Sequence, residues 1–152
     1  MINAEVLIES KNWKKIVINP KKYIKDILNK FPNRYKFIKK KVSITILLTN
    51  NKNIKLLNKK FRKKDKPTDI LSFPFFEKKD FKKTFRKKNF YLGDIIISYQ
   101  EFSKKNKNDY KNGFAKILIH GFLHLLNFDH KSDKDFRKMN TIENKIFQKV
   151  KG

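Results

Sequence analysis

The stretch HGFLHLLNFDH, residues 120–130, contains all three histidines of this 152-residue chain. His120 and His124 are four positions apart, so on a helix their side chains share one face, about 5–6 Å apart at Cβ. Asn127 suits the left-handed position that ends a helix and turns the chain, and His130 follows this turn. The turn can therefore bring a third imidazole to the same ion. Three histidine ligands on zinc leave the fourth tetrahedral position to water, which is the arrangement of a catalytic site.

The histidines also have a second interpretation, in which His120 and His124 are core residues hydrogen-bonded to the backbone and His130 lies at the surface. Burying each imidazole on an apolar helix without a partner costs about 1–3 kcal/mol. No such partner is evident nearby in the sequence, so metal binding is favoured. Two roles stay open for Asp129. It orients a ligand histidine by contacting the ring without binding the metal, or it caps the turn.

The positions of the histidines match the HExxHxxGxxH spacing of the metzincin proteases, in which the glutamate after the first histidine is the general base. Gly121 stands at that position here. A peptide hydrolase would need another base, so the spacing predicts a shared metal geometry and disfavours proteolysis.

The sequence on either side of the histidines predicts an α+β fold. The helix that carries them begins near Asp109 and is apolar nearly all round, which is typical of a buried helix. Elsewhere, β-branched runs predict strands, and apolar residues at helical spacing predict helices. The expected strands are residues 4–10, 41–50, 69–73 and 91–98; the other expected helices are residues 20–31, a short one around 54–61, and a final one opening at Ser132. Pro74 ends the third strand or places it at a sheet edge, and residues 11–20 extend or bend the first strand.

Residues 77–90 carry seven lysines and arginines interleaved with three phenylalanines. This pattern predicts a long loop, and such loops are uncommon in a compact domain unless they are functional or disordered. Its basic groups and aromatic rings could hold a single-stranded nucleic acid. A mobile lysine-rich segment is the alternative.

Length and composition place the chain among small basic proteins. We expect one domain spanning residues 1–152. The absence of cysteine agrees with a reducing compartment, so a cytoplasmic location is the default, and neither a signal peptide nor a membrane span is expected. The net charge of +25 favours a nucleic-acid partner. Part of the lysine excess has another possible source, since Lys, Asn, Ile and Phe are all encoded by A/T-rich codons.

These motifs together resemble the YbeY family of bacterial endoribonucleases and ribosome-maturation factors. HGFLHLLNFDH is similar to the family signature HGxLHLxGxDH, LNKKFRKKDKPTDILSFPF resembles its second signature block, and LGDIIIS resembles the strand that follows. The blocks occur in the expected order across residues 56–130. Two positions depart from the family pattern: Asn127 stands where glycine is usual, and Lys63 replaces the glycine that commonly follows Arg62.

The resemblance implies a single α+β domain with a small mixed four-stranded sheet, flanked by about five helices and similar to the zincin catalytic core. It also implies that His120, His124 and His130 bind one Zn²⁺, with Arg62 as an essential residue near the metal. The implied activity is zinc-dependent cleavage of single-stranded RNA in the cytoplasm. Its implied role is late maturation of the 16S rRNA precursor at its 3′ end on the small ribosomal subunit, together with ribosome quality control.

Cutting a phosphodiester requires a nucleophile, stabilisation of the developing negative charge and a grip on the strand. We expect the metal to activate water or polarise a phosphate oxygen, and Arg62 to bind the developing charge with its planar guanidinium. An alternative for Arg62 is an ion pair with Asp65 or Asp69. The residues expected to contact neighbouring RNA are Lys60, Lys63, Lys64, Lys66, Thr68 and Ser72, although for each lysine a solvated surface position is an equal alternative.

A different class of function is also compatible with these features. In that reading the protein is a non-catalytic ribosome assembly factor, in which zinc is structural and RNA binding is the function. The metal is open as well, because three histidines also suit nickel, copper or iron.

Overall fold

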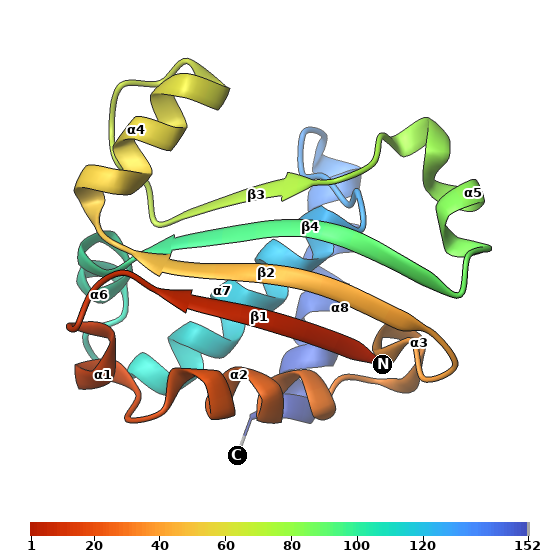
Figure 1. Ribbon diagram of the computed structural model, residues 1–152, viewed down its shortest axis with the longest axis horizontal. Coiled ribbons are helices and arrows are strands. Elements are labelled where there is room, and N and C mark those ends of the chain that lie inside the picture. Colours follow the sequence, from red (N-terminus) through yellow and green to blue (C-terminus); the bar gives the residue numbers. More distant parts are fainter. Residues whose placement is uncertain (152) are drawn as a thin grey trace.

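The computed structural model describes residues 1–151 and contains one mixed sheet. Its four strands are β1 (Ile2–Ile8), β2 (Lys41–Thr49), β3 (Ile70–Pro74) and β4 (Asn89–Ser98), in the spatial order β1-β2-β4-β3. β1 and β4 run parallel to the central β2, whereas β3 is an antiparallel edge strand beside β4 (Figure 1). The predicted α+β class, the four strands and the edge position of the strand that ends at Pro74 are confirmed.

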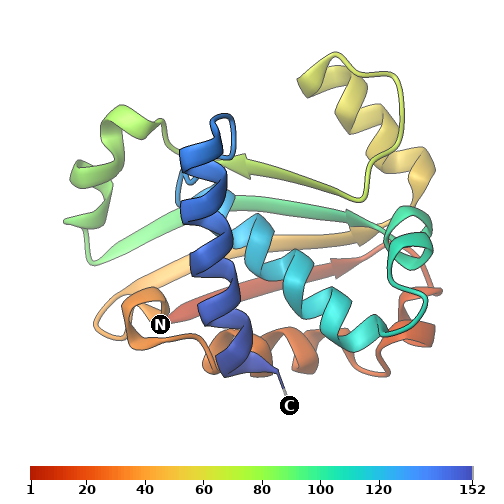
Figure 2. The ribbon, with the colours of Figure 1, turned by 180° about the vertical axis from the view of Figure 1, so that it is seen from behind.

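Two long helices, α7 (Tyr110–Leu125) and α8 (Asp133–Val150), cover one face of the sheet. Figure 2 shows α8 crossing α7, with both helices in front of the strands. Leu118, Phe122 and Leu125 of α7 are fully buried in the core that also contains Ile44 and Ile95 of the sheet. This burial fixes α7, and with it any group that α7 carries, against the sheet.

Each of the four longest helices begins at a residue whose side chain accepts a hydrogen bond from a backbone N–H in the first turn. Such a cap satisfies a donor that the helix itself leaves unpaired, and losing it costs about 1 kcal/mol. The helices are α2 (Pro20–Asn29), α4 (Asn51–Arg62), α7 and α8, and their caps are Asn19, Asn50, Asp109 and Ser132. The starts predicted at Asn19 and Ser132 are therefore confirmed.

Residues 1–151 contain eight α-helices, more than the expected five or so. The additional ones are short: α1 (Trp13–Ile16), α3 (Asn33–Lys36), α5 (Phe81–Phe85) and α6 (Tyr99–Lys105). One or two turns contain too few residues to show a helical period. Residues 11–20 thus do not extend β1; they contain α1, where buried Trp13 donates its indole N–H to the Thr49 carbonyl at 3.0 Å, and the first residue of α2. Within the described part of the chain, no helix has the length and apolar character needed to cross a membrane.

The prediction of a long loop at residues 77–90 was wrong. The segment forms a 3₁₀ turn, η1 (Lys78–Asp80), followed directly by α5 and the start of β4. Phe85 stacks on Phe37 with ring centroids 5.6 Å apart, and Phe81 lies edge-on to Phe85 at 4.1 Å. The aromatic residues that suggested a mobile or stacking loop therefore anchor the segment to the rest of the fold.

Candidate metal centre

The turn after α7 brings the three histidine rings together. Asn127 has a φ of 64°, the left-handed conformation predicted for it. The backbone N–H of Phe128 then donates back to the Leu123 carbonyl at 3.1 Å, which closes the turn. The His130 ring centroid lies 5.7 Å from that of His120 and 5.1 Å from that of His124. One candidate ligand atom from each ring lies within 4.8 Å of the others.

Hydrogen bonds at Nδ1 fix the orientation of two of these rings. His120 Nδ1 lies 2.6 Å from a Glu143 carboxylate oxygen of α8, and His124 Nδ1 lies 3.0 Å from the Phe128 carbonyl oxygen. A carbonyl and an ionised carboxylate only accept, so each neutral ring carries its proton on Nδ1 and a lone pair on Nε2. A metal-ligating histidine typically donates its other ring N–H in this way.

The two Nε2 atoms of His120 and His124 face each other at 3.0 Å. Two lone pairs at this distance repel unless a cation lies between them, so the donor set fits a metal ion shared by the rings. Burial of the His124 ring, and then the proximity of His120 and His130, lower the pKa of His124 from its ordinary value of 6.5. His124 is therefore held in the neutral form that binds metals.

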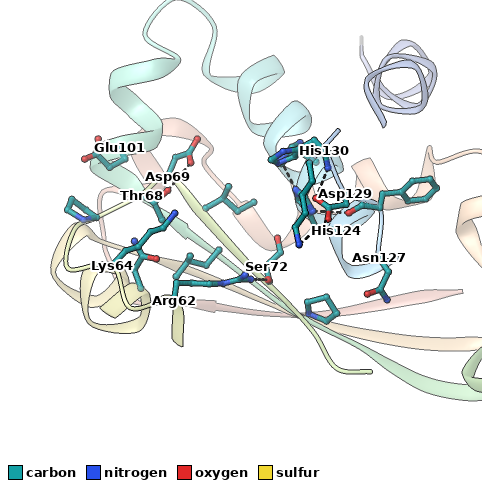
Figure 3. Close-up of a pocket in the computed structure, with 18 of the residues that line it drawn as sticks. Arg62, Lys64, Thr68, Asp69, Ser72, Glu101, His124, Asn127, Asp129 and His130 are labelled. Atoms are coloured by element: carbon teal, nitrogen blue, oxygen red, sulfur yellow. Dashed lines mark hydrogen bonds and ion pairs between the residues drawn. The ribbon is translucent and has the colours of Figure 1, made fainter. Parts of the chain in front are cut away.

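A cavity of about 980 Å³ lies between β3, the chain segment that precedes it, and the turn after α7. The three histidines line one side of it, and Arg62 lies across from them (Figure 3). The other predicted residues in its wall are Lys64, Lys66, Thr68, Ser72 and Asp129. The structure thus brings together residues that are up to 68 positions apart in the sequence, from Arg62 to His130.

Arg62 is the last residue of α4, and its guanidinium is held at the edge strand. Nη2 donates to the Ser72 carbonyl at 2.8 Å, and the guanidinium carbon lies 5.3 Å from the centroid of the Phe73 ring. These contacts orient the planar group at the cavity wall, and the side chain remains exposed. The alternative that Arg62 pairs with Asp65 or Asp69 is wrong, because these carboxylates form ion pairs with lysines (Lys55, Lys59 and Lys105).

Lys63, predicted to contact RNA, is instead the residue that ends α4. Its φ of 58° lies in the left-handed region, which favours glycine. Glycine adopts this conformation without strain, and in this chain lysine adopts it. Among the described residues, Lys63 is not part of the cavity wall.

Asp129 lies at the cavity and supports the turn. One of its carboxylate oxygens accepts the backbone N–H of His130 at 2.6 Å, and the other lies 3.8 Å from the Lys131 ammonium. Of the two roles left open for Asp129, these contacts correspond to the cap. The carboxylate that contacts a histidine ring is that of Glu143.

Glu143 was not predicted from the sequence, although a signal for it exists. It interrupts the apolar stripe of α8 formed by Met139, Ile146 and Val150, which are all buried. An acidic residue in such a stripe faces the protein interior and needs a partner there. Three further cations line the cavity, Lys78, Lys105 and Lys131. Lys78 belongs to the basic segment 77–90, for which nucleic-acid binding was one of the two interpretations, whereas nothing in the sequence indicated Lys105 or Lys131.

Gly121 allows α7 to approach β3 closely. A Cβ atom at this position would lie 2.8 Å from Ile70 Cδ1 and 3.2 Å from both Ile95 Cγ2 and Ser72 Oγ. The position that carries the general base in metzincins is therefore pressed against the sheet, where a glutamate side chain has no room.

Comparison with known proteins agrees with this architecture and with the motifs. The family model described as Endoribonuclease YbeY matches residues 7–151. A protein of Pelagibacter ubique (strain HTCC1062) named Endoribonuclease YbeY is 52% identical over 155 residues, covering 99% of this chain and 97% of its own. A protein of the same name from Ehrlichia canis (strain Jake) is 35% identical over 149 residues, covering 96% and 92%.

A solution structure of a Thermotoga maritima protein has the same fold, with a TM-score of 0.59 and 28% sequence identity. It is matched over 97% of this chain and 89% of its own. The motifs, the near-complete coverage by relatives and the family model lead to one conclusion: the chain belongs to the YbeY endoribonuclease family.

Proposed function

We propose that this protein is a zinc-dependent endoribonuclease that cuts single-stranded RNA, with one zinc ion held by His120, His124 and His130. The observation that carries the proposal is that two Nε2 lone pairs face each other at the wall of a cavity lined by cations. Relatives that share most of their length with this chain are named endoribonucleases. Bound zinc supplies Lewis acidity toward a phosphate oxygen and toward water at neutral pH.

The chain's own residues supply the binding of phosphate charge. The guanidinium of Arg62 is planar and its orientation is fixed by the Ser72 carbonyl, so it can donate two parallel hydrogen bonds to the phosphate being cleaved. Such donors are most effective when they are already oriented before the reaction.

The remaining cations of the cavity hold the strand on either side of the cleaved bond. Lys64 and Lys66 extend the wall beyond Arg62, and Thr68 and Ser72 supply hydroxyl groups that can donate to phosphate oxygens. Glu143 acts through His120, because its carboxylate accepts the Nδ1–H and so presents Nε2 to the metal.

The resemblance to the family extends the proposal to the substrate. The RNA is the 16S rRNA precursor, cut at its 3′ end on the small ribosomal subunit in the cytoplasm, and the same activity serves ribosome quality control. The net charge of +25 agrees with a polyanionic partner such as this RNA.

The test compares cleavage of a labelled single-stranded RNA by wild type and His120→Ala, purified in parallel and assayed with and without zinc after chelation. A protein this basic carries contaminating ribonucleases through purification, and the paired variant controls for them. The proposal predicts cleavage only by zinc-loaded wild type. Equal cleavage by both proteins would contradict it. RNA binding without cleavage by either would favour the non-catalytic assembly factor.

A further inference from the structure

A second cavity, of about 440 Å³, adjoins the metal-centre cavity. It lies between α3, α5 and the turn after α7, and four residues line both cavities: Lys78, Asn127, Phe128 and Asp129. A ligand that extends from one cavity into the other would pass between these residues. The second cavity therefore borders the proposed site of cleavage, and none of the histidines lines it.

The wall of this cavity is aromatic. Tyr35 and Phe37 come from α3 and its end, Phe81 and Phe85 from α5, and Phe128 from the turn, and each is partly exposed. Aromatic side chains bind nucleobases by stacking, and the interaction tolerates any base because every base has a π-face. Cavities of roughly 300–1,000 Å³ are the usual size for small planar ligands.

The charged groups around the cavity favour a ligand with phosphates. Three cations line it, Arg34, Lys78 and Lys138, together with the carboxylates of Asp129 and Asp135. Asp129 is already paired with the His130 backbone and with Lys131. The net charge of the lining side chains is positive. A neutral base can therefore enter the cavity while the phosphates of its nucleotide contact the cations.

Asn127, one of the four residues shared by the two cavities, also carries a buried donor. Asn127 Nδ2 is buried and, within residues 1–151, meets no hydrogen-bond acceptor. An unsatisfied buried donor costs about 1–3 kcal/mol, so it calls for an explanation. A carbonyl oxygen or ring nitrogen of a base is an acceptor of the kind this amide lacks. In Figure 3 Asn127 and Lys64 lie on opposite sides of His124. Asn127 also lines the second cavity.

We propose that the second cavity binds an unpaired nucleobase of the RNA, belonging to a nucleotide next to the phosphate held at the metal centre. This inference rests on the proposed function and extends it to the substrate. A base inside a duplex is paired and stacked on both faces and cannot enter the cavity. The cavity therefore selects single-stranded RNA. Asn127 and Phe81 are the specificity-determining residues, and Lys78 binds a phosphate of the same strand.

The first test uses wild type alone. An intact single-stranded RNA oligonucleotide is compared with a series of otherwise identical RNAs. Each RNA of the series carries one abasic residue, at a different position within two nucleotides of the cleaved bond. At one position, removing the base should raise KM by about fivefold or more, the range expected for one stacked base. A change below twofold at every position would overturn the proposal.

The second test asks whether the effect originates in this cavity. Asn127→Gly removes the amide and keeps a residue suited to the positive φ, and Phe81→Leu removes a π-face and keeps apolar volume. Both variants should reduce the difference in KM between the intact and the abasic RNA, with folding checked by thermal melting. Asn127→Gly and Phe81→Leu proteins that both keep the full difference would overturn the proposal.

The cations of the cavity are tested separately. Lys78→Gln should weaken binding of both RNAs. Lys82→Gln, the same change at a neighbouring exposed lysine outside both cavities, should not.

A binding measurement separates failure of this inference from failure of the proposed function. An RNA carrying 2-aminopurine at the sensitive position is titrated with the full-length protein, and the stacking of the base is read as fluorescence quenching without any need for cleavage. Quenching that Phe81→Leu abolishes supports the base site, and absence of quenching in wild type overturns it. Loss of cleavage with quenching intact would refute the nuclease activity alone.

Discussion

At the scale of single residues, Glu143 fixes the orientation of the His120 ring and of the Nε2 atom proposed to bind the metal. Its carboxylate accepts from His120 Nδ1 at 2.6 Å. Partners of ligand histidines typically contribute 10-fold to 100-fold in metal affinity, so Glu143→Gln should weaken zinc binding by about tenfold, since the amide keeps an acceptor and loses the charge. Competition with a chromogenic chelator measures this, and Glu77→Gln, at an exposed residue paired only with Lys79, is the matched control. Equal zinc affinity in wild type and Glu143→Gln would contradict this role.

The role proposed for Arg62 depends on the planar shape of its guanidinium as well as on its charge. Arg62→Lys keeps the charge and loses the planar group that the Ser72 carbonyl orients. We expect the cleavage rate in single-turnover assays to fall by about tenfold to a hundredfold. Zinc stoichiometry should not change, because Arg62 contacts none of the histidines by hydrogen bond in the described structure. The exposed Arg86→Lys serves as control, and a normal rate for Arg62→Lys would contradict the role proposed for the guanidinium.

The residues of the site could be predicted from the sequence to different degrees, for a physical reason. The histidines are close in sequence and lie on one helix and its turn, so spacing alone brought them together. Arg62 was placed near the metal by resemblance, because its contact with Ser72 spans two elements. Glu143 was missed, since its partner is 23 positions away on another helix.

At the scale of elements, the packing of α7 on β3 sets the geometry of the site. A Cβ at Gly121 would already lie 2.8 Å from Ile70 Cδ1. Gly121→Glu, which would introduce the metzincin residue, should therefore destabilise the fold by about 3 kcal/mol or more through overpacking and a buried carboxylate. Thermal or denaturant unfolding measures the change. Lys111→Glu, an exposed site on the same helix, should change stability by less than about 0.5 kcal/mol. An unchanged melting temperature for Gly121→Glu would show that the contact is not tight.

Elements of different length were predicted with different success. The strands and the four longest helices follow from hydrophobic periodicity and from caps such as Asn19 and Ser132. The one-turn and two-turn helices could not be seen, because tertiary contacts create them. α5 is the clearest case: its lysines suggested a loop, and the contact of Phe85 with Phe37 orders it.

At the scale of the whole molecule, the charge should act through a few positions. Each phosphate neutralised on a single strand contributes about −0.7 to the slope of log K against log salt concentration. A Lys64→Gln/Lys66→Gln double variant should therefore reduce the magnitude of this slope by about 1.4, measured by fluorescence anisotropy with labelled single-stranded RNA. The double variant Lys14→Gln/Lys15→Gln, at exposed positions of α1, removes the same charge far from the cavity in sequence. Equal slopes for the two double variants would mean that RNA binds the basic surface without preference for the cavity.

A zinc titration of the metal-free full-length protein can show whether the three histidines form the catalytic metal site. The initial rate of cleavage of a labelled single-stranded RNA is recorded at each step. The three histidines form one site, so the rate should rise in proportion to added zinc and stop rising at about one ion per chain. A contaminating nuclease would not follow the concentration of this protein. A rate independent of zinc, or one that shows no break near one equivalent, would contradict the assignment of the histidine cluster as the catalytic metal site.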